Sequence, residues 1–278
     1  MKILPLAFDS LGTRSMATFV KTDIKILIDP SAALGPSRYG LPPHPLEVKR
    51  LEEHIATINR CAKKCDVLIV THYHYDHHNP NAPEIFEGKT ALVKHPKEKI
   101  NASQKQRASY FLSLIKPKTL EYADGREFVF KNTRIKFSQP VFHGTNPKLG
   151  YVVEVCVEHE GEKFLHSSDV EGPSIKEQAD FILHEKPNVV FIDGPMTYML
   201  GYRYAGESYE ESIKNLKEIA KICDALVLDH HLLRDLKWRE RVKEVEKIRH
   251  VMSAAEFAGK KEELLEARRK ELYETEPV

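Results

Sequence analysis

The chain has 278 residues, of which 41% are apolar and 30% charged, and its formal net charge is +1. This balance excludes a protein that holds nucleic acid by bulk electrostatic attraction, so long nucleic acid is not expected as a partner. No apolar run is long enough to cross a bilayer, and Met1–Pro5 lacks the pattern of a secretory signal. We therefore expect a cytoplasmic protein with no membrane association. The sequence predicts no particular oligomeric state.

The first part of the chain predicts strands that alternate with helices. Apolar and β-branched runs predict strands over Lys2–Phe8, 18–20, 24–28 and Asp66–Val70. A loop rich in proline and glycine spans residues 30–45, and apolar residues at helical spacing predict an amphipathic helix over Leu46–Cys65. A second helix is expected over Lys97–Ile115.

From Leu120 to Ser168 the apolar residues alternate, which is typical of strands. We predict strands over residues 128–130, 134–137, 151–157 and 163–166, with hairpin turns at Lys131–Asn132 and at 159–161. A helix (175–184), a strand (188–192), a helix opened by a capping box of Ser208 and Glu211, and a strand (225–228) follow. The charged segment after Lys237 predicts helices, with a break at Gly259 before Lys260–Tyr273.

This order of elements predicts an α/β fold in which two mixed sheets pack face to face with helices outside. Residues 1–236 are expected to form one domain, and residues 237–278 a C-terminal helical extension of it.

The most informative motif is H-x-H-x-D-H, formed by His72, His74, Asp76 and His77 directly after the predicted strand Asp66–Val70. So many imidazoles are costly to bury together unless a cation is bound among them. His72 and His74 project to the same side of an extended chain, so they can bind one ion. Asp76 and His77 are then placed for a second ion.

Three further candidates for metal ligands stand at predicted strand ends: His143, Asp169 and His230. With these residues the chain resembles the metallo-β-lactamase superfamily of binuclear hydrolases, from about Lys2 to His231. The resemblance implies a four-layered αββα sandwich.

The resemblance also implies a role for each residue of the motif. One metal would be held by His72, His74 and His143, the other by Asp76, His77 and His230, with Asp169 between them. Asp29, at the end of a predicted strand, matches the aspartate that supports such sites. His231 is an alternative to His230 as the last ligand. His78 and Asp229 are expected either to orient ligating rings or to be ordinary polar groups.

These residues favour a metal-dependent hydrolase in which two metal ions, zinc before iron or manganese, activate a hydroxide. The hydroxide attacks an ester, phosphodiester or related substrate, Asp169 holds the metals, and Asp76 orients the nucleophile. One alternative is an iron-dependent oxidoreductase, because histidine and carboxylate also bind iron. Another is a non-catalytic binding module, although that would predict broken ligands.

Two loops combine arginine with tyrosine and are candidates for substrate binding. Arg38 lies in residues 37–44, and Tyr202 and Arg203 lie in residues 197–204. Such side chains can stack on a base and clamp a phosphate, which would suit a small-molecule or short nucleotide substrate. The equal alternative is that the tyrosines serve only to cover the sandwich edge.

Overall fold

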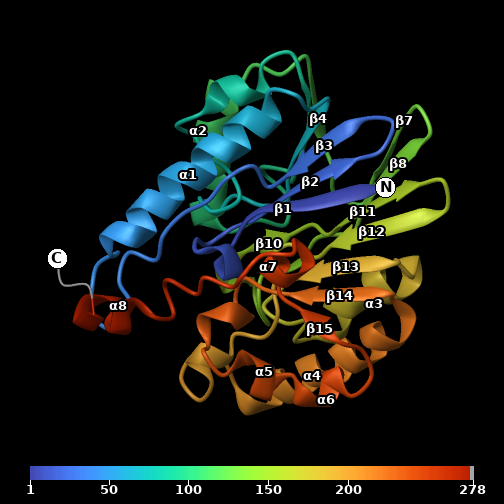
Figure 1. Ribbon diagram of the computed structural model, residues 1–278. Helices are drawn as coiled ribbons and strands as arrows, with labels where there is room; N and C mark the ends of the chain where they lie inside the picture. Colours follow the sequence, from blue (N-terminus) through green and yellow to red (C-terminus); the bar gives the residue numbers. More distant parts are fainter. Residues whose placement is uncertain (276–278) are drawn as a thin grey trace.

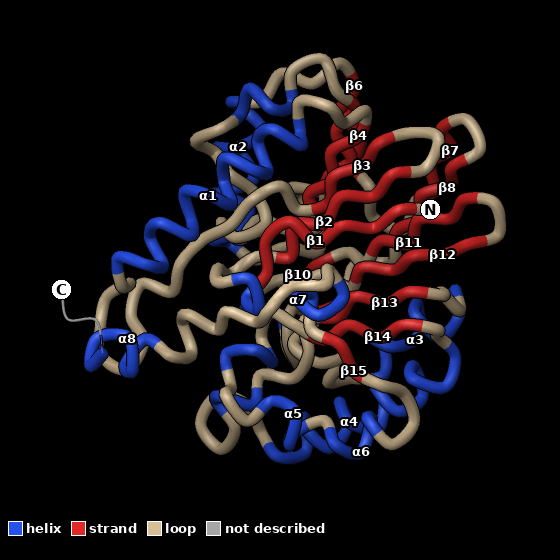
Figure 2. The backbone as a smooth tube through the Cα atoms, in the orientation of Figure 1, coloured by secondary structure: helices blue, strands red, loops and turns tan. Residues whose placement is uncertain are grey.

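The computed structural model describes residues 1–275, in which two β-sheets lie face to face and helices cover their outer sides (Figure 1; Figure 2). The expected four-layered αββα sandwich is therefore confirmed. Within the described residues, no helix combines the length and the apolar character needed to cross a membrane.

The first sheet contains six strands in sequential order. They are β1 (Lys2–Phe8), β2 (Met16–Lys21), β3 (Lys25–Ile28), β4 (Val67–Val70), β5 (Thr90–Val93) and β6 (Thr119–Tyr122). β1 to β3 pair antiparallel, and β3 to β6 pair parallel. Strand β4 is covered on both faces, which explains its unbroken run of valine, leucine and isoleucine.

The second sheet has the order β15-β14-β13-β12-β11-β8-β7. Its strands are β7 (Glu127–Phe130), β8 (Thr133–Phe137), β11 (Val155–His159), β12 (Glu162–His166), β13 (Val189–Ile192), β14 (Ala225–Leu228) and β15 (Val251–Met252). β12 to β15 run parallel, and β7, β8, β11 and β12 pair antiparallel. The predicted turns at Lys131 and Gly161 join hairpins, and both residues have positive φ.

The helices form the two outer layers. α1 (Pro45–Ala62) and α2 (Ala102–Leu114) cover the first sheet, and α3 (Lys176–Glu185), α4 (Gly206–Ile222), α5 (Trp238–Arg241) and α6 (Lys243–Glu246) cover the second. α1 begins with proline at its first position and with a capping box between His44 and Glu47.

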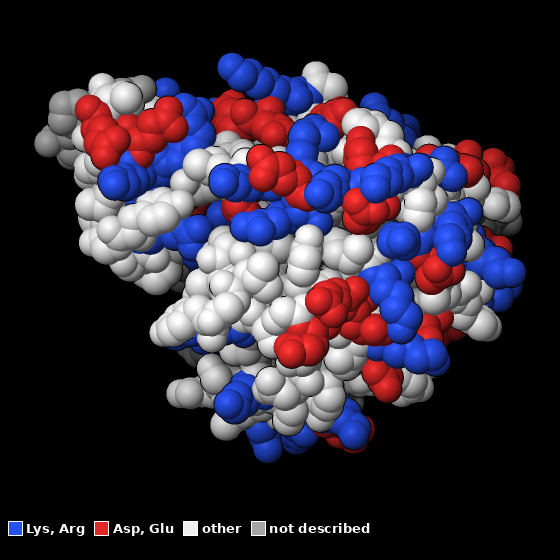
Figure 3. Space-filling model, turned by 90° about the horizontal axis from the view of Figure 1, so that it is seen from below, with Lys and Arg blue, Asp and Glu red and all other residues white. Residues whose placement is uncertain are grey.

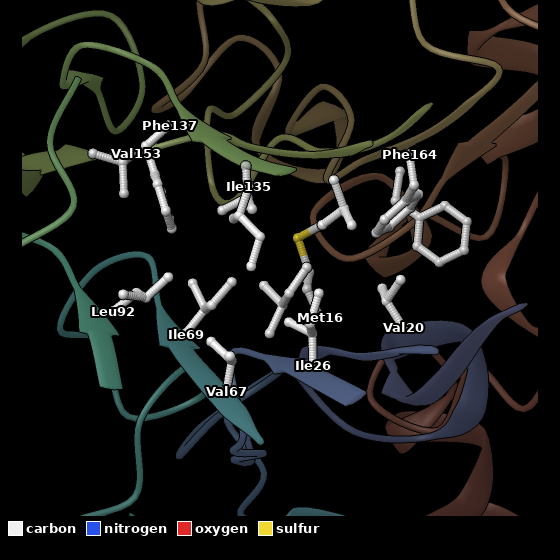
Figure 4. Close-up of a cluster of buried hydrophobic side chains, with 14 of the residues drawn as sticks. Met16, Val20, Ile26, Val67, Ile69, Leu92, Ile135, Phe137, Val153 and Phe164 are labelled. Carbon is white, nitrogen blue, oxygen red and sulfur yellow. The ribbon is translucent and has the colours of Figure 1, made fainter. Parts of the chain in front are cut away.

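The central core lies between the two sheets (Figure 4). Met16, Ile26 and Ile69 from the first sheet point toward Ile135 and Phe164 from the second, and all five side chains are buried. Each contributes roughly 1.5–3 kcal/mol through removal of apolar surface from water. This core holds the strand ends that carry the site in fixed positions.

Two local predictions are wrong because tertiary contacts override the local pattern. α4 begins at Gly206, so Ser208 and Glu211 lie inside the helix and form no capping box. Its start is set by the buried Tyr204, whose hydroxyl is 2.6 Å from Ser174 Oγ and 3.2 Å from the Ser208 carbonyl. The predicted strand 151–157 is split, because its first part pairs with β9 (Val141–Phe142) as β10 (Tyr151–Val152) while β11 joins the second sheet.

The prediction of a helical segment after Lys237 is also wrong in part. β15 pairs with β14, and α7 (Ala254–Phe257) and α8 (Arg269–Thr275) are short, with an extended stretch between them. This stretch crosses to the start of α1 (Figure 1), where Glu266 pairs with Arg14 and Arg269 with Glu47. These ion pairs favour an extended path over a long helix. Residues 276–278 of the expected extension lie outside the described residues.

The surface charges are mixed in sign. On the face in Figure 3, lysine and arginine side chains lie among aspartate and glutamate side chains, and a broad uncharged area lies in the middle of the view. That distribution agrees with the net charge of +1.

His54 provides a test of how α1 packs. Its ring is buried with Nδ1 2.7 Å from Thr13 Oγ1, and burial, together with the charges of Arg50 and Lys260, lowers its pKa from 6.5 to about 4. The unfolded chain therefore binds more protons between pH 6.5 and 4, so the free energy of unfolding should fall by up to about 3 kcal/mol as the pH falls through that range. Chemical denaturation of His54→Gln should lack this part of the pH dependence, whereas the exposed His184→Gln should keep it. Identical profiles for wild type and His54→Gln would contradict the packing.

Candidate metal centre

Each predicted ligand follows the carboxyl end of a strand. His72, His74, Asp76 and His77 follow β4, His143 follows β9, Asp169 follows β12 and His230 follows β14. β12, β13 and β14 are parallel, and β4 lies between parallel neighbours in the facing sheet. The loops at these strand ends meet at one edge of the sandwich, where α/β folds usually bind ligands.

The seven predicted ligands converge in two groups, each with its metal-binding atoms within 4.8 Å of one another. The first donor group consists of His72, His74, His143 and Asp169, and the second of Asp76, His77, Asp169 and His230. Asp169 belongs to both. The structure therefore brings together all the residues that the resemblance marked as ligands.

The Asp169 carboxylate lies between the two donor groups. Its Oδ1 is 3.0 Å from His77 Nε2. Its Oδ2 is 3.4 Å from both His143 Nε2 and His230 Nε2, and 3.7 Å from His72 Nε2. One carboxylate can therefore contact ions held by either group.

The donor atoms fit a bound cation because several are buried without a hydrogen bond. Within residues 1–275 these are His72 Nε2, His77 Nε2 and Asp169 Oδ1, and the 3.0 Å contact between the last two lacks hydrogen-bond geometry. A buried polar group left unsatisfied costs about 1–3 kcal/mol. A divalent cation bound among these imidazole nitrogens and carboxylate oxygens would remove this cost.

Two rings of the first donor group are held in the form that binds metal. Burial, together with the charges of neighbouring histidines, lowers the pKa of His72 well below its usual value. Burial and the nearby His143 lower the pKa of His74 to about 3. Both imidazoles are therefore neutral at pH 7 and offer a lone pair.

The charges of Asp169 and the histidines beside it stabilise one another. Burial disfavours ionisation of Asp169, but His77 and His230 hold its pKa well below the usual range. Burial likewise disfavours protonation of His230, yet Asp169 raises its pKa to about 9. Metal binding should therefore displace protons from this cluster.

Asp29 holds His77 in place. It directly follows β3 with a φ of 50°, accepts hydrogen bonds from Thr71 N at 2.8 Å and Thr71 Oγ1 at 2.7 Å, and its Oδ2 is 2.8 Å from His77 Nδ1. A proton on Nδ1 that bonds to this carboxylate leaves Nε2 directed at Asp169. Asp29 thus orients the His77 ring and is itself a member of neither donor group.

Asp9 plays the same part for His230, and the sequence analysis missed it. Its Oδ2 is 2.6 Å from His230 Nδ1, and its Oδ1 accepts a hydrogen bond from Arg234 Nε at 2.9 Å. The signal that would have found it is its position directly after β1, like that of Asp29 after β3.

The replacement Asp9→Asn tests this support. We expect it to weaken zinc binding by about 10–100-fold, because the His230 ring loses the charged partner that orients it and raises its basicity. Competition with a chelator of known affinity measures the change, and the exposed Asp180→Asn serves as the matched control. Equal zinc affinity in all three proteins would show that Asp9 has no such role.

The structure places His230, not His231, in the second donor group. His231 Nδ1 is 2.7 Å from Asp193 Oδ2, and its donor atoms group with those of His143 and Glu171 and with those of Asp169 and Asp193. Glu171 Oε1 is 3.4 Å from His143 Nδ1, a contact that the sequence analysis did not predict.

Asp229 and His78 support the backbone of the site loops. Asp229 Oδ1 accepts hydrogen bonds from the backbone N–H groups of Ser10 and His230, and its Oδ2 accepts one from Ala254 N. His78 Nδ1 is 2.9 Å from the His74 carbonyl. Both side chains are buried and bond to backbone atoms, not to a ligating ring.

The proposed substrate-binding side chains differ in their surroundings. Arg38 donates from Nη2 to the Arg234 carbonyl at 3.0 Å and stacks 4.6 Å from the centre of the Tyr198 ring. Tyr202 is 78% exposed. Arg203, in contrast, lines a cavity of about 490 Å³ that also includes the predicted ligand His143.

The chain belongs to the metallo-β-lactamase superfamily, whose family model matches residues 12–228. Among curated proteins, it is 57% identical to a UPF0282 protein of Korarchaeum cryptofilum over 286 residues, which cover 100% of this chain and 96% of the relative. It is 44% identical to a UPF0282 protein of Methanocaldococcus jannaschii over 293 residues, covering 100% and 98%.

Solved structures of low identity share the fold. Yeast PDE1 is similar with a TM-score of 0.53 and 15% identity, covering 90% of this chain and 95% of that one. Zn²⁺-bound PqqB from Methylobacterium extorquens is similar with a TM-score of 0.52 and 13% identity, covering 91% and 98%.

Proposed function

We propose that this protein is a metal-dependent hydrolase with two divalent cations, one in each donor group. The observation that carries the proposal is the Asp169 carboxylate, which lies within 3.7 Å of a ring nitrogen on four histidines from three separate segments. His72, His74 and His143 would hold one cation, and Asp76, His77 and His230 the other.

Two bound cations would supply a water of lowered pKa near neutral pH and Lewis-acid stabilisation of a developing oxyanion. Asp76 would orient the attacking water, because its carboxylate is ionised. Burial disfavours that ionisation, but His77 and His230 lower the pKa of Asp76 to about 2. It can therefore accept a hydrogen bond at pH 7 and receive the proton of the water. Asp29 and Asp9 keep His77 and His230 oriented throughout.

Zinc is the metal we propose, with iron or manganese as the next candidates. Five histidines and two aspartates make up the two donor groups, and nitrogen-rich sites suit zinc. The zinc-bound PqqB structure, which shares the fold, is consistent with that choice.

The substrate we propose is a small ester or phosphodiester, including a short nucleotide. The net charge of +1, together with the mixed charges on the face seen in Figure 3, favours a small substrate over long nucleic acid, which would need a continuous basic surface. We also propose a cytoplasmic location, because all four cysteines are free thiols, as in reducing compartments.

Elemental analysis of the purified full-length protein, combined with a substrate screen, tests this function. We expect about two zinc ions per chain and hydrolysis of at least one class among phosphodiesters, lactones, thioesters and β-lactams. Chelation should abolish that activity and zinc should restore it. Stoichiometric iron with a visible absorption band would favour an oxidoreductase, and a metal-free chain with no turnover would favour a binding module.

A further inference from the structure

The cavity of about 490 Å³ beside the metal centre is lined by both positive and apolar side chains. It reaches the centre through His143 and Glu171, and its other walls come from residues 144–149 and 196–208. Its volume is in the range of pockets that enclose small organic molecules.

Two positive side chains, Lys148 and Arg203, line this cavity. Within the part of the chain that the structure describes, neither side chain has a carboxylate within 4.0 Å, whereas Lys214 and Arg268, for example, each pair with a glutamate. The one acidic side chain of the lining is Glu171, which lies 3.4 Å from His143 Nδ1. The two cations are therefore available to an anionic ligand. The first turn of α4 lines the same cavity through Ser208, and a helix N-terminus favours negative charge.

The remaining lining is largely apolar and includes Leu149, Met196 and Met199. Tyr198 adds an aromatic ring whose position is fixed, because its hydroxyl accepts a 3.4 Å hydrogen bond from Arg234 Nη1 and the Arg38 guanidinium stacks on it. Methionines and a fixed aromatic ring form a surface that suits an apolar or aromatic group.

A second, larger cavity of about 720 Å³ lies between α1 and the loop after the motif, but its composition is different. Its charged lining residues are Glu52 and Glu84, and none of the ligands in the two donor groups lines it. An anionic substrate would be repelled there.

We propose that the cavity beside His143 binds the substrate, and that this substrate has an apolar or aromatic body and a carboxylate or phosphate group. The anion pairs with Lys148 and Arg203, the body packs on Tyr198 and the methionines, and the group to be hydrolysed faces the metal centre. The assignment rests on the proposed hydrolase function for its chemistry, but its binding can be measured without turnover.

Calorimetric titration of the full-length, zinc-loaded protein tests this assignment. The probes are phenylphosphonate and phenylacetate, which distinguish the two kinds of anion, and the neutral phenylacetamide. In the double variant Lys148→Gln/Arg203→Gln we expect at least about tenfold weaker binding of an anionic probe and unchanged binding of the neutral one. The matched control Lys214→Gln/Lys221→Gln removes the same charge from exposed positions on α4 and should bind every probe like wild type.

The outcomes separate the two proposals. The cavity assignment fails if both variants bind the anionic probes as tightly as wild type. It also fails if the control variant loses as much affinity for these probes as the double variant does. In either case the metal centre stands. If the protein holds no zinc but the double variant alone loses anion binding, the hydrolase function fails and the assignment of the cavity stands.

Discussion

Asp169→Asn is expected to lose most of its bound metal and to reduce hydrolysis by more than about 100-fold. Loss of a group that merely supports a ligand already weakens a metal site by 10–100-fold, and Asp169 is the carboxylate shared by both donor groups. The amide has the same shape as the carboxylate but no charge. The positive charge around the buried His77, His143 and His230 is then no longer balanced by an anion.

Elemental analysis and kinetics on the same preparation measure this effect, and circular dichroism checks the fold. The exposed Asp180→Asn on α3 provides the matched control and should retain both metal and activity. Two metal ions and wild-type turnover in Asp169→Asn would contradict the shared carboxylate.

Arg269→Met is expected to lower the free energy of unfolding by about 3–5 kcal/mol. Arg269 is fully buried and binds Glu47 through two hydrogen bonds of 2.7 and 2.8 Å, while it also donates to the carbonyls of Leu41 and Gly35. Removal of the guanidinium leaves the Glu47 carboxylate buried without its partner. It also releases α8 from the start of α1.

The neighbouring Arg268 offers a matched control, because it is half exposed and pairs with Glu271 on the surface. Arg268→Met should cost less than about 1 kcal/mol. Denaturant titration of both variants compares them directly, and similar losses in the two would mean that the buried pair does not anchor the C-terminal segment.

The sequence alone was sufficient to predict the sandwich and the position of the motif, because both predictions depend on local patterns. The apolar run Val67–Val70 identifies a buried strand. His72 and His74 follow it closely and begin the H-x-H-x-D-H motif, which predicts a metal site. The order of His143, Asp169 and His230, each after a strand-like run, placed the remaining predicted ligands at strand ends. The structure brings these side chains together.

The residues that the sequence analysis missed act through contacts between distant segments. Asp9 and His230 are 221 positions apart, and no local pattern connects them. The same holds for Arg269 and Glu47, which are separated by 222 positions, and this pair fixes a segment whose composition favours a helix. β5 and β6 were also missed, and β6 is mostly exposed, so it has no clear alternation of apolar residues.

The most direct test of the account is anomalous diffraction at the zinc edge from crystals of the zinc-loaded protein. We predict two peaks on either side of the Asp169 carboxylate, one within ligating distance of His72, His74 and His143 and the other of Asp76, His77 and His230. Absence of both peaks, or zinc bound only elsewhere on the protein, would contradict the account.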